Sequence, residues 1–254
     1  MGRIEGKAAI ISGSASGIGE AVTRRFAAEG ARLWLNDINA ARLDALVTEL
    51  RGQGVEVHGT VGDVSDSAFV NDWVDAANAT FGRIDILYNN VGVSRHALVG
   101  DTSDDDWRFQ QRMTLDTVFY ATRAVLPHMV RERKGSIVSM SSGAGVAGEY
   151  ALGAYAAAKA GVINLMETVA MEYGPYGIRA NAVTPGPTVT PPMMAWLESQ
   201  PGGEADHSKD LDLQRFSRPE EVAYAVLFLA SDEASNITGI VLRSNIRAGK
   251  RPFT

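Results

Sequence analysis

The chain has 254 residues, 45% of them hydrophobic, with no cysteine and a formal net charge of −6. This size is ample for the core of one α/β domain, and the acidic balance argues against nucleic acid, which requires a basic surface. The absence of cysteine excludes disulfides and thiol chemistry, and the longest apolar stretch, 222–230, is far too short to cross a membrane.

The chain begins without the apolar core of a signal peptide, so we expect a cytoplasmic protein. Its first predicted elements are a strand, a glycine-rich loop and a helix. An apolar run at 8–12 leads directly into Gly13-Ser14-Ala15-Ser16-Gly17-Ile18-Gly19, and apolar residues at helical spacing follow over 20–29. In this context glycines allow close backbone approach, and the start of the helix offers free N–H groups to an anion. The pattern favours a pyrophosphate-binding loop over an ordinary strand-to-helix turn.

The second predicted strand, 32–36, ends at Asp37. A carboxylate about 20 residues beyond the glycine loop can accept hydrogen bonds from the adenosine ribose, and it would repel a 2′-phosphate. No basic residue lies between Gly13 and Gly19, and Ile38 follows Asp37. The sequence therefore predicts NAD rather than NADP. The alternative is that Asp37 merely caps the next helix, predicted at 40–50.

Strands and helices continue to alternate along the rest of the chain. Further strands are predicted at 55–61, 84–89, 136–141, 179–183 and 240–242, and helices at 67–80, 104–131, 155–173 and 219–230. This order predicts an α/β fold with a doubly wound parallel sheet (Rossmann-type) of about seven strands, with helices on both faces and ligands at the carboxyl ends of the strands. We expect residues 1–254 to form a single domain, with a substrate loop at about 187–216.

Several conspicuous side chains are expected to be structural. Ser103 and the three aspartates after it indicate a capped helix start rather than a metal site, and no metal is predicted. His58 and His128 have no catalytic partner near them in sequence. His96 and Glu149 are alternatives, because they could line the substrate site or simply be exposed loop residues.

Tyr155 and Lys159 stand one helical turn apart, so their polar ends can converge on one face of the helix 155–173. An ammonium group beside a phenol favours the phenolate, so Lys159 is expected to lower the pKa of Tyr155 from its usual value near 10. This pair predicts a general acid/base that works near neutral pH. Ser142, just after strand 136–141, could hold the oxygen to which the tyrosine gives its proton.

Six ordered motifs resemble those of the short-chain dehydrogenase/reductase family, and the similarity extends from about residue 4 to residue 242. They are SGSASGIG at 12–19, Asp63-Val64, Asn89-Asn90-Val91-Gly92, Ser142, Tyr155 with Lys159, and the stretch 181–186. The resemblance implies that Tyr155 is the acid/base, that Ser142 binds the substrate oxygen and that Lys159 also holds the nicotinamide ribose.

The resemblance also implies a set of cofactor contacts. Asp63 and Val64 would hold the adenine, Asn90 would pack beside the adenosine ribose, and Thr188 and Thr190 would hold the nicotinamide carboxamide. The full implied set is Gly13, Ser16, Gly17, Ile18, Gly19, Asp37, Asp63, Val64, Asn90, Gly92, Tyr155, Lys159, Pro185, Gly186, Thr188 and Thr190.

The chain departs from the family pattern at two places. Many members have an asparagine seven residues after a tryptophan that starts a helix, but counting from Trp107 places Thr114 there. Thr114 is therefore expected to support the proton relay with a hydroxyl in place of an amide. At the other place, where the family usually continues to a DGG turn, this chain has 244–247 (SNIR), with Arg243, Lys250 and Arg251 nearby.

Together these features predict an NAD(H)-dependent oxidoreductase that interconverts a secondary alcohol and a ketone, with a small-molecule substrate and neither nucleic acid nor membrane as a partner. One alternative is a catalytically silent nucleotide-binding protein on the same fold, and another is an epimerase or dehydratase that uses the cofactor transiently. A homodimer or homotetramer is expected. Helix 155–173 carries apolar residues such as Val162, Leu165, Met166 and Val169, and one face of it must meet its own sheet, so its remaining apolar positions would leave an exposed patch on a monomer.

Overall fold

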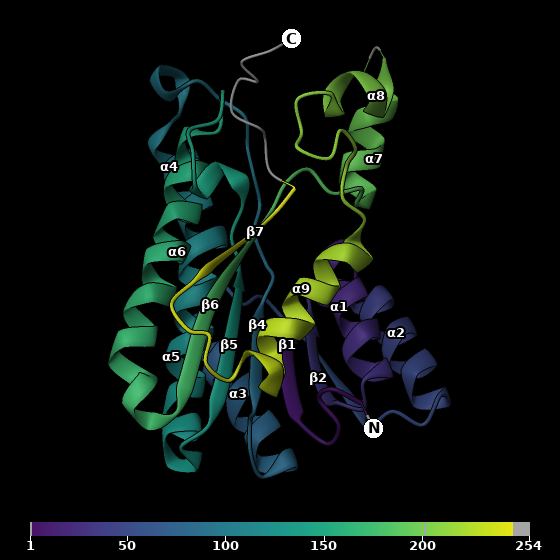
Figure 1. Cartoon of the computed structure of the whole chain (residues 1–254), viewed down its shortest axis with the longest axis vertical. Helices are drawn as coiled ribbons and strands as arrows, with labels where there is room; N and C mark the ends of the chain where they lie inside the picture. Colours follow the sequence, from purple (N-terminus) through teal and green to yellow (C-terminus); the bar gives the residue numbers. More distant parts are fainter. Residues whose placement is uncertain (1, 201, 246–254) are drawn as a thin grey trace.

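The computed structural model describes residues 2–200 and 202–245, and its centre is one sheet of seven strands (Figure 1). The strand order is β3-β2-β1-β4-β5-β6-β7, and all neighbouring strands are parallel. The strands are β1 (Ala8–Ser12), β2 (Arg32–Asp37), β3 (Val57–Val61), β4 (Ile86–Asn89), β5 (Gly135–Met140), β6 (Ile178–Pro185) and β7 (Val241–Ser244). This architecture confirms the predicted doubly wound sheet.

Helices cover both faces of the sheet and divide the core into two layers. One layer joins the sheet to α1 (Gly17–Ala28), α2 (Ala40–Gly52) and α9 (Pro219–Ala230), with Phe26, Leu43 and Val226 among its buried side chains. The other joins it to α3 (Ser67–Phe81), α5 (Thr117–Glu132) and α6 (Gly153–Tyr173), and includes Trp73 and Met166. Figure 1 shows the two groups of helices on either side of the sheet. Short 3-10 turns lie at Val99–Asp101, Gly143–Gly145, Gly174–Tyr176 and Asp232–Ala234.

The predicted single helix 104–131 is interrupted by one turn of π-helix. It consists of α4 (Asp104–Gln111), the π turn (Arg112–Asp116) and α5. A π turn accommodates one extra residue within a helix, and such turns are frequent at functional sites. Thr114 lies in this turn and is fully buried. The predicted helix start is confirmed, because the Ser103 hydroxyl accepts a hydrogen bond from the Asp106 amide at 3.0 Å.

The predicted substrate loop contains two short helices, α7 (Pro191–Glu198) and α8 (Gly203–Ser208), which stand above the carboxyl ends of the strands in Figure 1. They enclose a small cluster of buried side chains separate from the two main layers, made by Leu197, Leu211 and Phe216. The segment is therefore folded around its own core. Among the described residues, none of the helices is both long enough and apolar enough to cross a membrane.

The apolar residues named on α6 in the sequence belong to the protein's own core or pack against it. Val162, Met166 and Val169 are at most 4% exposed, and Leu165 packs against the same layer. They form the face of α6 that packs against its own sheet and α5, as expected, so they offer little apolar surface to a partner copy. Exposed apolar side chains remain at Trp107, Phe119 and Met171, the last of them 74% exposed.

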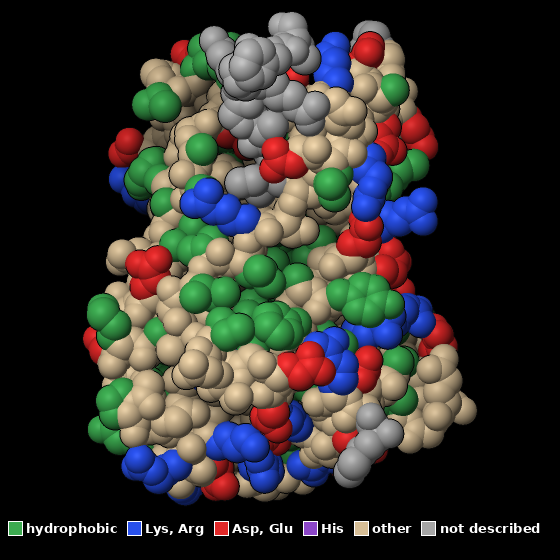
Figure 2. All heavy atoms as spheres, in the orientation of Figure 1, with side chains coloured by type: hydrophobic (Ala, Val, Ile, Leu, Met, Phe, Trp, Pro, Cys, Tyr) green, Lys and Arg blue, Asp and Glu red, His purple; other side chains and the backbone are tan. Residues whose placement is uncertain are grey.

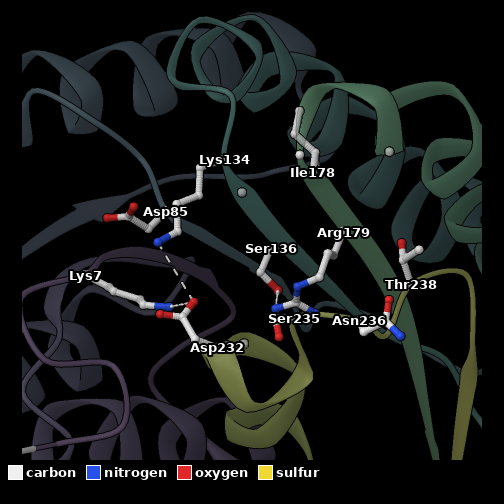
Figure 3. Close-up of a pocket in the computed structure, with 14 residues that line it drawn as sticks. Lys7, Asp85, Lys134, Ser136, Ile178, Arg179, Asp232, Ser235, Asn236 and Thr238 are labelled. Carbon is white, nitrogen blue, oxygen red and sulfur yellow. Dashed lines mark hydrogen bonds and ion pairs between the residues drawn. The ribbon is translucent and has the colours of Figure 1, made fainter.

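A cavity of about 280 Å³ lies at the amino-terminal ends of the strands, opposite the predicted site (Figure 3). The ammonium groups of Lys7 and Lys134 both point to Asp232, at 2.6 and 4.0 Å, and the hydrogen bond from Lys7 is the main reason that the pKa of Asp232 is lowered. Arg179 donates to the carbonyl oxygens of Leu229 and Ser231 at 2.7 and 3.1 Å. This network joins the starts of the strands to the end of α9, so we interpret it as structural.

Candidate active site

The structure brings the predicted site residues to one edge of the sheet. The residues at or just after the carboxyl ends of the strands are Ser12, Asp37, Asp63, Asn90, Ser142 and Pro185. Because the strands are parallel, these ends lie side by side, and the crevice beside the switch from β1 to β4 is where such folds bind ligands.

The glycine loop between β1 and α1 is shaped so that only glycine fits at several positions. Gly13 and Gly17 have φ of +60° and +54°, in the left-handed region. A Cβ atom added at Gly19 would lie 1.9 Å from the carbonyl oxygen of Gly13. Ser16 is the N-cap of α1, and its side chain makes no capping hydrogen bond, so the first amides of that helix are not capped by it. This bare loop at a helix start fits the pyrophosphate of a dinucleotide.

Asp37 is fixed beside this loop. One carboxylate oxygen accepts a hydrogen bond from the Ala15 amide at 2.9 Å, and the other accepts one from the Asn39 amide at 2.9 Å. The N-cap of α2 is Asn39, whose side chain accepts from the Arg42 amide. The alternative that Asp37 merely caps the next helix is therefore wrong. The charge stands where an adenosine ribose would lie against the loop.

The side chains of Asn90 and Val64 are engaged within the protein. The Asn90 amide donates to the carbonyl oxygen of Gly13 at 2.9 Å, and its oxygen accepts from the Tyr88 hydroxyl at 3.1 Å. Asn90 thus braces the glycine loop against β4. Val64 is 3% exposed in the core, so its side chain does not face solvent, while the preceding Asp63 accepts from the Ser65 amide at 2.8 Å.

Tyr155, Lys159 and Ser142 come together between α6 and the end of β5. Lys159 Nζ lies 5.7 Å from the ring centre of Tyr155 and donates to the carbonyl oxygen of Met140 at 2.7 Å. The Ser142 hydroxyl lies near enough to the Tyr155 phenol to lower its pKa as a hydrogen-bond donor, and it accepts a hydrogen bond from the Ala144 amide at 3.2 Å. The Met140 contact could not have been predicted from the sequence, because a backbone carbonyl leaves no signal in residue type.

The expected effect of Lys159 on Tyr155 is wrong for the protein on its own. Burial raises the pKa of Tyr155 to about 12, and the negative charge of Glu149 acts in the same direction, while the Ser142 hydrogen bond opposes them. Burial also lowers the pKa of Lys159 to about 7. The physical reason is that desolvation disfavours both charged forms, and it outweighs the attraction expected between an ammonium group and a phenolate.

Gly92 separates Lys159 from the π turn. A Cβ atom at Gly92 would lie 2.7 Å from Lys159 Nζ and 3.9 Å from the methyl group of Thr114. Thr114 itself is buried, and its hydroxyl donates to the carbonyl oxygen of Val93 at 3.4 Å. The structure therefore places Thr114 close to Lys159, with its hydroxyl directed to the segment after Gly92.

The nicotinamide side of the predicted site is formed by the segment after β6. The Thr188 hydroxyl donates to the carbonyl oxygen of Gly186 at 3.0 Å, and Thr188 is 6% exposed. The methyl group of Thr190 would lie 3.1 Å from a Cβ atom at Gly17. Thr190 therefore lies against the start of α1, and Pro185, Gly186 and Thr188 lead to it from the end of β6.

His58 and His128 make structural contacts, as the sequence predicted. His58 stacks on Trp34, with ring centres 4.7 Å apart, and His128 pairs with Asp75 at 3.1 Å. His96 is exposed, one residue before Ala97, which forms a bridge with Leu152 near the start of α6. Across the described ranges, 2–200 and 202–245, no group of three or more His, Cys, Asp or Glu side chains could hold a metal ion.

Comparisons with known proteins give the family. The model described as enoyl-(acyl carrier protein) reductase matches residues 13–245. A 3-oxoacyl-(acyl-carrier-protein) reductase of Thermotoga maritima is 42% identical, with 94% of this chain and 96% of that protein covered. D-threitol dehydrogenase of Mycolicibacterium smegmatis is 38% identical over 93% of this chain and 90% of its own.

Solved structures agree with the sequence comparisons. A Burkholderia xenovorans protein assigned to the short-chain dehydrogenases/reductases is 34% identical, has a TM-score of 0.91, and is covered over 97% of its length by 96% of this chain. The structure of gox2181 is 32% identical, with a TM-score of 0.91 and 95% of each chain covered. Members of this family use nicotinamide cofactors. The chain belongs to the short-chain dehydrogenase/reductase family and is an oxidoreductase.

Proposed function

We propose that the protein is an NAD(H)-dependent enzyme that interconverts a secondary alcohol and a ketone. The observation that carries the proposal is the placement of Tyr155, Lys159 and Ser142 at one sheet edge, beside a glycine loop that carries the Asp37 carboxylate. A titratable pair with pKa values shifted by burial, next to a loop that fits a pyrophosphate, is typical of a catalytic site rather than of a packing solution. The same observation disfavours a catalytically silent role.

The bound cofactor would accept or supply the hydride, and the chain's own residues handle the proton. At neutral pH Tyr155 is protonated, because its pKa is about 12, and it can give the phenolic proton to an oxygen that becomes an alkoxide. Ser142 would donate to the same oxygen and stabilise its developing charge. Lys159, with a pKa of about 7, can take or give a proton near neutral pH and so restore the proton of Tyr155.

The substrate class is supported by what the relatives are named for. They include dehydrogenases for D-threitol and for 2,3-dihydro-2,3-dihydroxybenzoate, and a reductase for 3-oxoacyl groups. The test is a panel of two kinds of substrate, with NADH absorbance as the measurement. Secondary alcohols, including vicinal diols and polyols, are mixed with NAD, and 3-oxoacyl thioesters are mixed with NADH. Net NADH production supports a dehydrogenase. Conversion of a substrate without any net change in NADH would instead indicate an epimerase or dehydratase.

Asp37 is expected to set the cofactor preference. We predict that the protein binds NADH more tightly than NADPH. Asp37→Asn should reduce the ratio of the NADPH dissociation constant to the NADH dissociation constant by at least about tenfold, because the charge that repels a 2′-phosphate is lost. Asp37→Asn retains an oxygen for the Ala15 amide, whereas Asp37→Ala removes both the hydrogen bond to the glycine loop at Ala15 and the one to the Asn39 amide. Comparing the two variants by NADH and NADPH fluorescence titration separates charge from loop support. Equal affinities in the wild type would contradict the assignment.

We also propose that the protein is a homodimer or homotetramer. Figure 2 shows hydrophobic side chains gathered in a band across the middle of the face where α9 and β7 lie in Figure 1. Tyr224 on α9 is 50% exposed, and Ile240, just before β7, is 37% exposed. Together with Phe119 and Met171 on the helices of the opposite layer, these residues leave apolar surface that a partner copy would cover.

Light scattering of the purified protein at micromolar concentration should report two or four times the chain mass. A monomer would contradict the proposal. The stretch 244–247, where the sequence departs from the family pattern, lies partly outside the described residues. A dimer in place of a tetramer would implicate this stretch in the missing interface.

A further inference from the structure

The two ends of the segment 187–217, which carries α7 and α8, lie side by side. We call the backbone contacts that join these ends the neck. The Val189 amide donates to the Ser217 carbonyl at 2.9 Å, and the Ser217 amide donates to the Pro187 carbonyl at 2.9 Å, which makes a parallel bridge between Thr188 and Ser217. Just before the neck, the Gly186 amide donates to the Ser244 carbonyl at 2.8 Å. The outgoing limb of the segment is thus held to the end of β7 by its backbone.

The side chain of Asn245, the residue after β7, holds the return limb of the segment (213–217) to the same strand end. The Asn245 oxygen accepts from the Leu213 amide at 3.0 Å. Its amide group donates to the Arg215 carbonyl at 2.7 Å and to the Ser217 hydroxyl at 3.4 Å. These partners are alternate residues of the return limb, so a single amide group fixes the stretch 213–217 along its length.

The backbone of Asn245 adopts a conformation that suits few residues. Its φ is +47°, in the left-handed region, which asparagine and glycine adopt more readily than other residues. The residue lies in the stretch 244–247, where the chain departs from the DGG turn usual in the family. Asn245 therefore supplies both the turn and the polar contacts at this position.

Beyond the neck, the segment holds itself together. Leu197, Leu211 and Phe216 form its small core, and the Phe216 amide donates to the Glu204 carboxylate at 2.9 Å. Because the segment packs around its own core, we expect it to move as one body. A further attachment lies at its return limb, where Arg215 pairs with Glu221 on α9 at 2.6 Å. The contacts at the neck, together with this ion pair, then set the position of α7 and α8 over the carboxyl ends of the strands.

We infer that Asn245 is a positioning residue, whose amide latches the return limb 213–217 to the end of β7 and thereby sets where α7 and α8 lie over the substrate. The latch itself is a property of the fold. Its effect on kinetics rests on the proposed function, because it assumes that the substrate lies between this segment and Tyr155.

Three variants of the full-length protein test the latch. Asn245→Gly keeps the left-handed backbone accessible and removes all three hydrogen bonds of the side chain. Asn245→Ala removes the bonds and also strains the backbone. Asn245→Asp keeps the acceptor for the Leu213 amide and loses the two donors. A control far from the segment is Asp75→Asn, which removes the carboxylate that contacts His128 between α3 and α5.

The first readout is amide hydrogen exchange of peptides covering 209–217, which does not depend on activity. Asn245→Gly and Asn245→Ala should exchange about tenfold faster there, and Asn245→Asp less so, with peptides of β1, β4 and β5 unchanged. Asp75→Asn should leave the exchange of 209–217 as in the wild type. The latch is refuted if Asn245→Gly exchanges like the wild type while Asn245→Ala does not, because the backbone conformation alone would then explain the residue.

The second readout is steady-state kinetics with a substrate found in the panel. The two latch-free variants should raise the substrate KM by about fivefold to tenfold and change kcat much less, because Tyr155, Lys159 and Ser142 are untouched. Faster exchange with an unchanged KM would overturn the positioning role. If the proposed function failed, no substrate would turn over in the wild type either, and the exchange measurement would still decide whether the latch exists.

Discussion

Replacing Tyr155 by phenylalanine should remove turnover by more than the roughly 10²–10⁴-fold that acid/base catalysis usually contributes. The substitution deletes one oxygen atom, and this oxygen is the one placed to exchange a proton with the substrate. Ser142, which lies beside the phenol, cannot replace it, because no lysine, arginine or histidine among the described residues hydrogen-bonds its hydroxyl and could supply or take up the proton. The measurement is kcat in both directions with the best substrate of the panel.

Two controls distinguish a chemical loss from a folding defect. The dissociation constant for NADH and the urea midpoint of Tyr155→Phe should both stay near the wild-type values. Ser142→Ala should lose turnover by a smaller factor, because it weakens the stabilisation of the substrate oxygen but leaves the proton donor in place. A Tyr155→Phe protein that retains turnover within about tenfold of the wild type would remove Tyr155 from the mechanism.

Lys159 should make the protein more stable as the pH rises above neutrality. Burial lowers the pKa of Lys159 to about 7, whereas the same group in the unfolded chain has its ordinary value of 10.5. Between these two values the unfolded chain holds a proton that the folded protein has released, so the free energy of unfolding increases with pH. The increase is on the order of 1 kcal/mol per pH unit, or about 3 kcal/mol from pH 7 to 9.5.

The comparison that isolates this effect is between the wild type and Lys159→Met, by urea unfolding of the cofactor-free protein at half-unit steps of pH. The wild type should show the rise, and the variant, which has no titratable group at position 159, should lack it. Lys134→Met serves as the control, because the Lys134 side chain is 54% exposed and its removal should leave the slope intact. The same slope in the wild type and in Lys159→Met would show that Lys159 keeps its proton when the protein folds.

The fold was predictable because its local signals agree with one another. Residues 8–29 show an apolar run, a glycine loop and an amphipathic pattern, which indicate a strand, a turn and a helix. This order places the N-terminus of the helix beside the loop, as in phosphate-binding sites. Asp37, Asn90 and Ser142 each lie at or just after the end of a strand. The rule that parallel strands present their carboxyl ends to one edge then predicts that these residues lie near one another. The predicted strand bounds differ from the observed ones by at most two residues at either end.

What the sequence could not predict depends on contacts between distant parts of the chain. The pKa of Tyr155 was assigned from one neighbour on the same helix, whereas burial by surrounding elements decides its direction. Helical spacing does not show how much of α6 the sheet covers, so it could not predict which apolar residues of that helix remain exposed. The π turn, and the amide latch at Asn245, likewise have no signature in residue type alone.

The order of strands in the sheet also has a consequence for synthesis of the chain. Strands β1, β2 and β3 form one half of the sheet from the first 61 residues, and β4 to β7 form the other half, so only the pairing of β1 with β4 joins them. All five residues of β1 are buried in the finished protein, yet one of its edges has no neighbour until residues 86–89 have left the ribosome. The nascent protein therefore carries an open, apolar strand edge at its centre, which is the kind of surface that chaperones protect from aggregation.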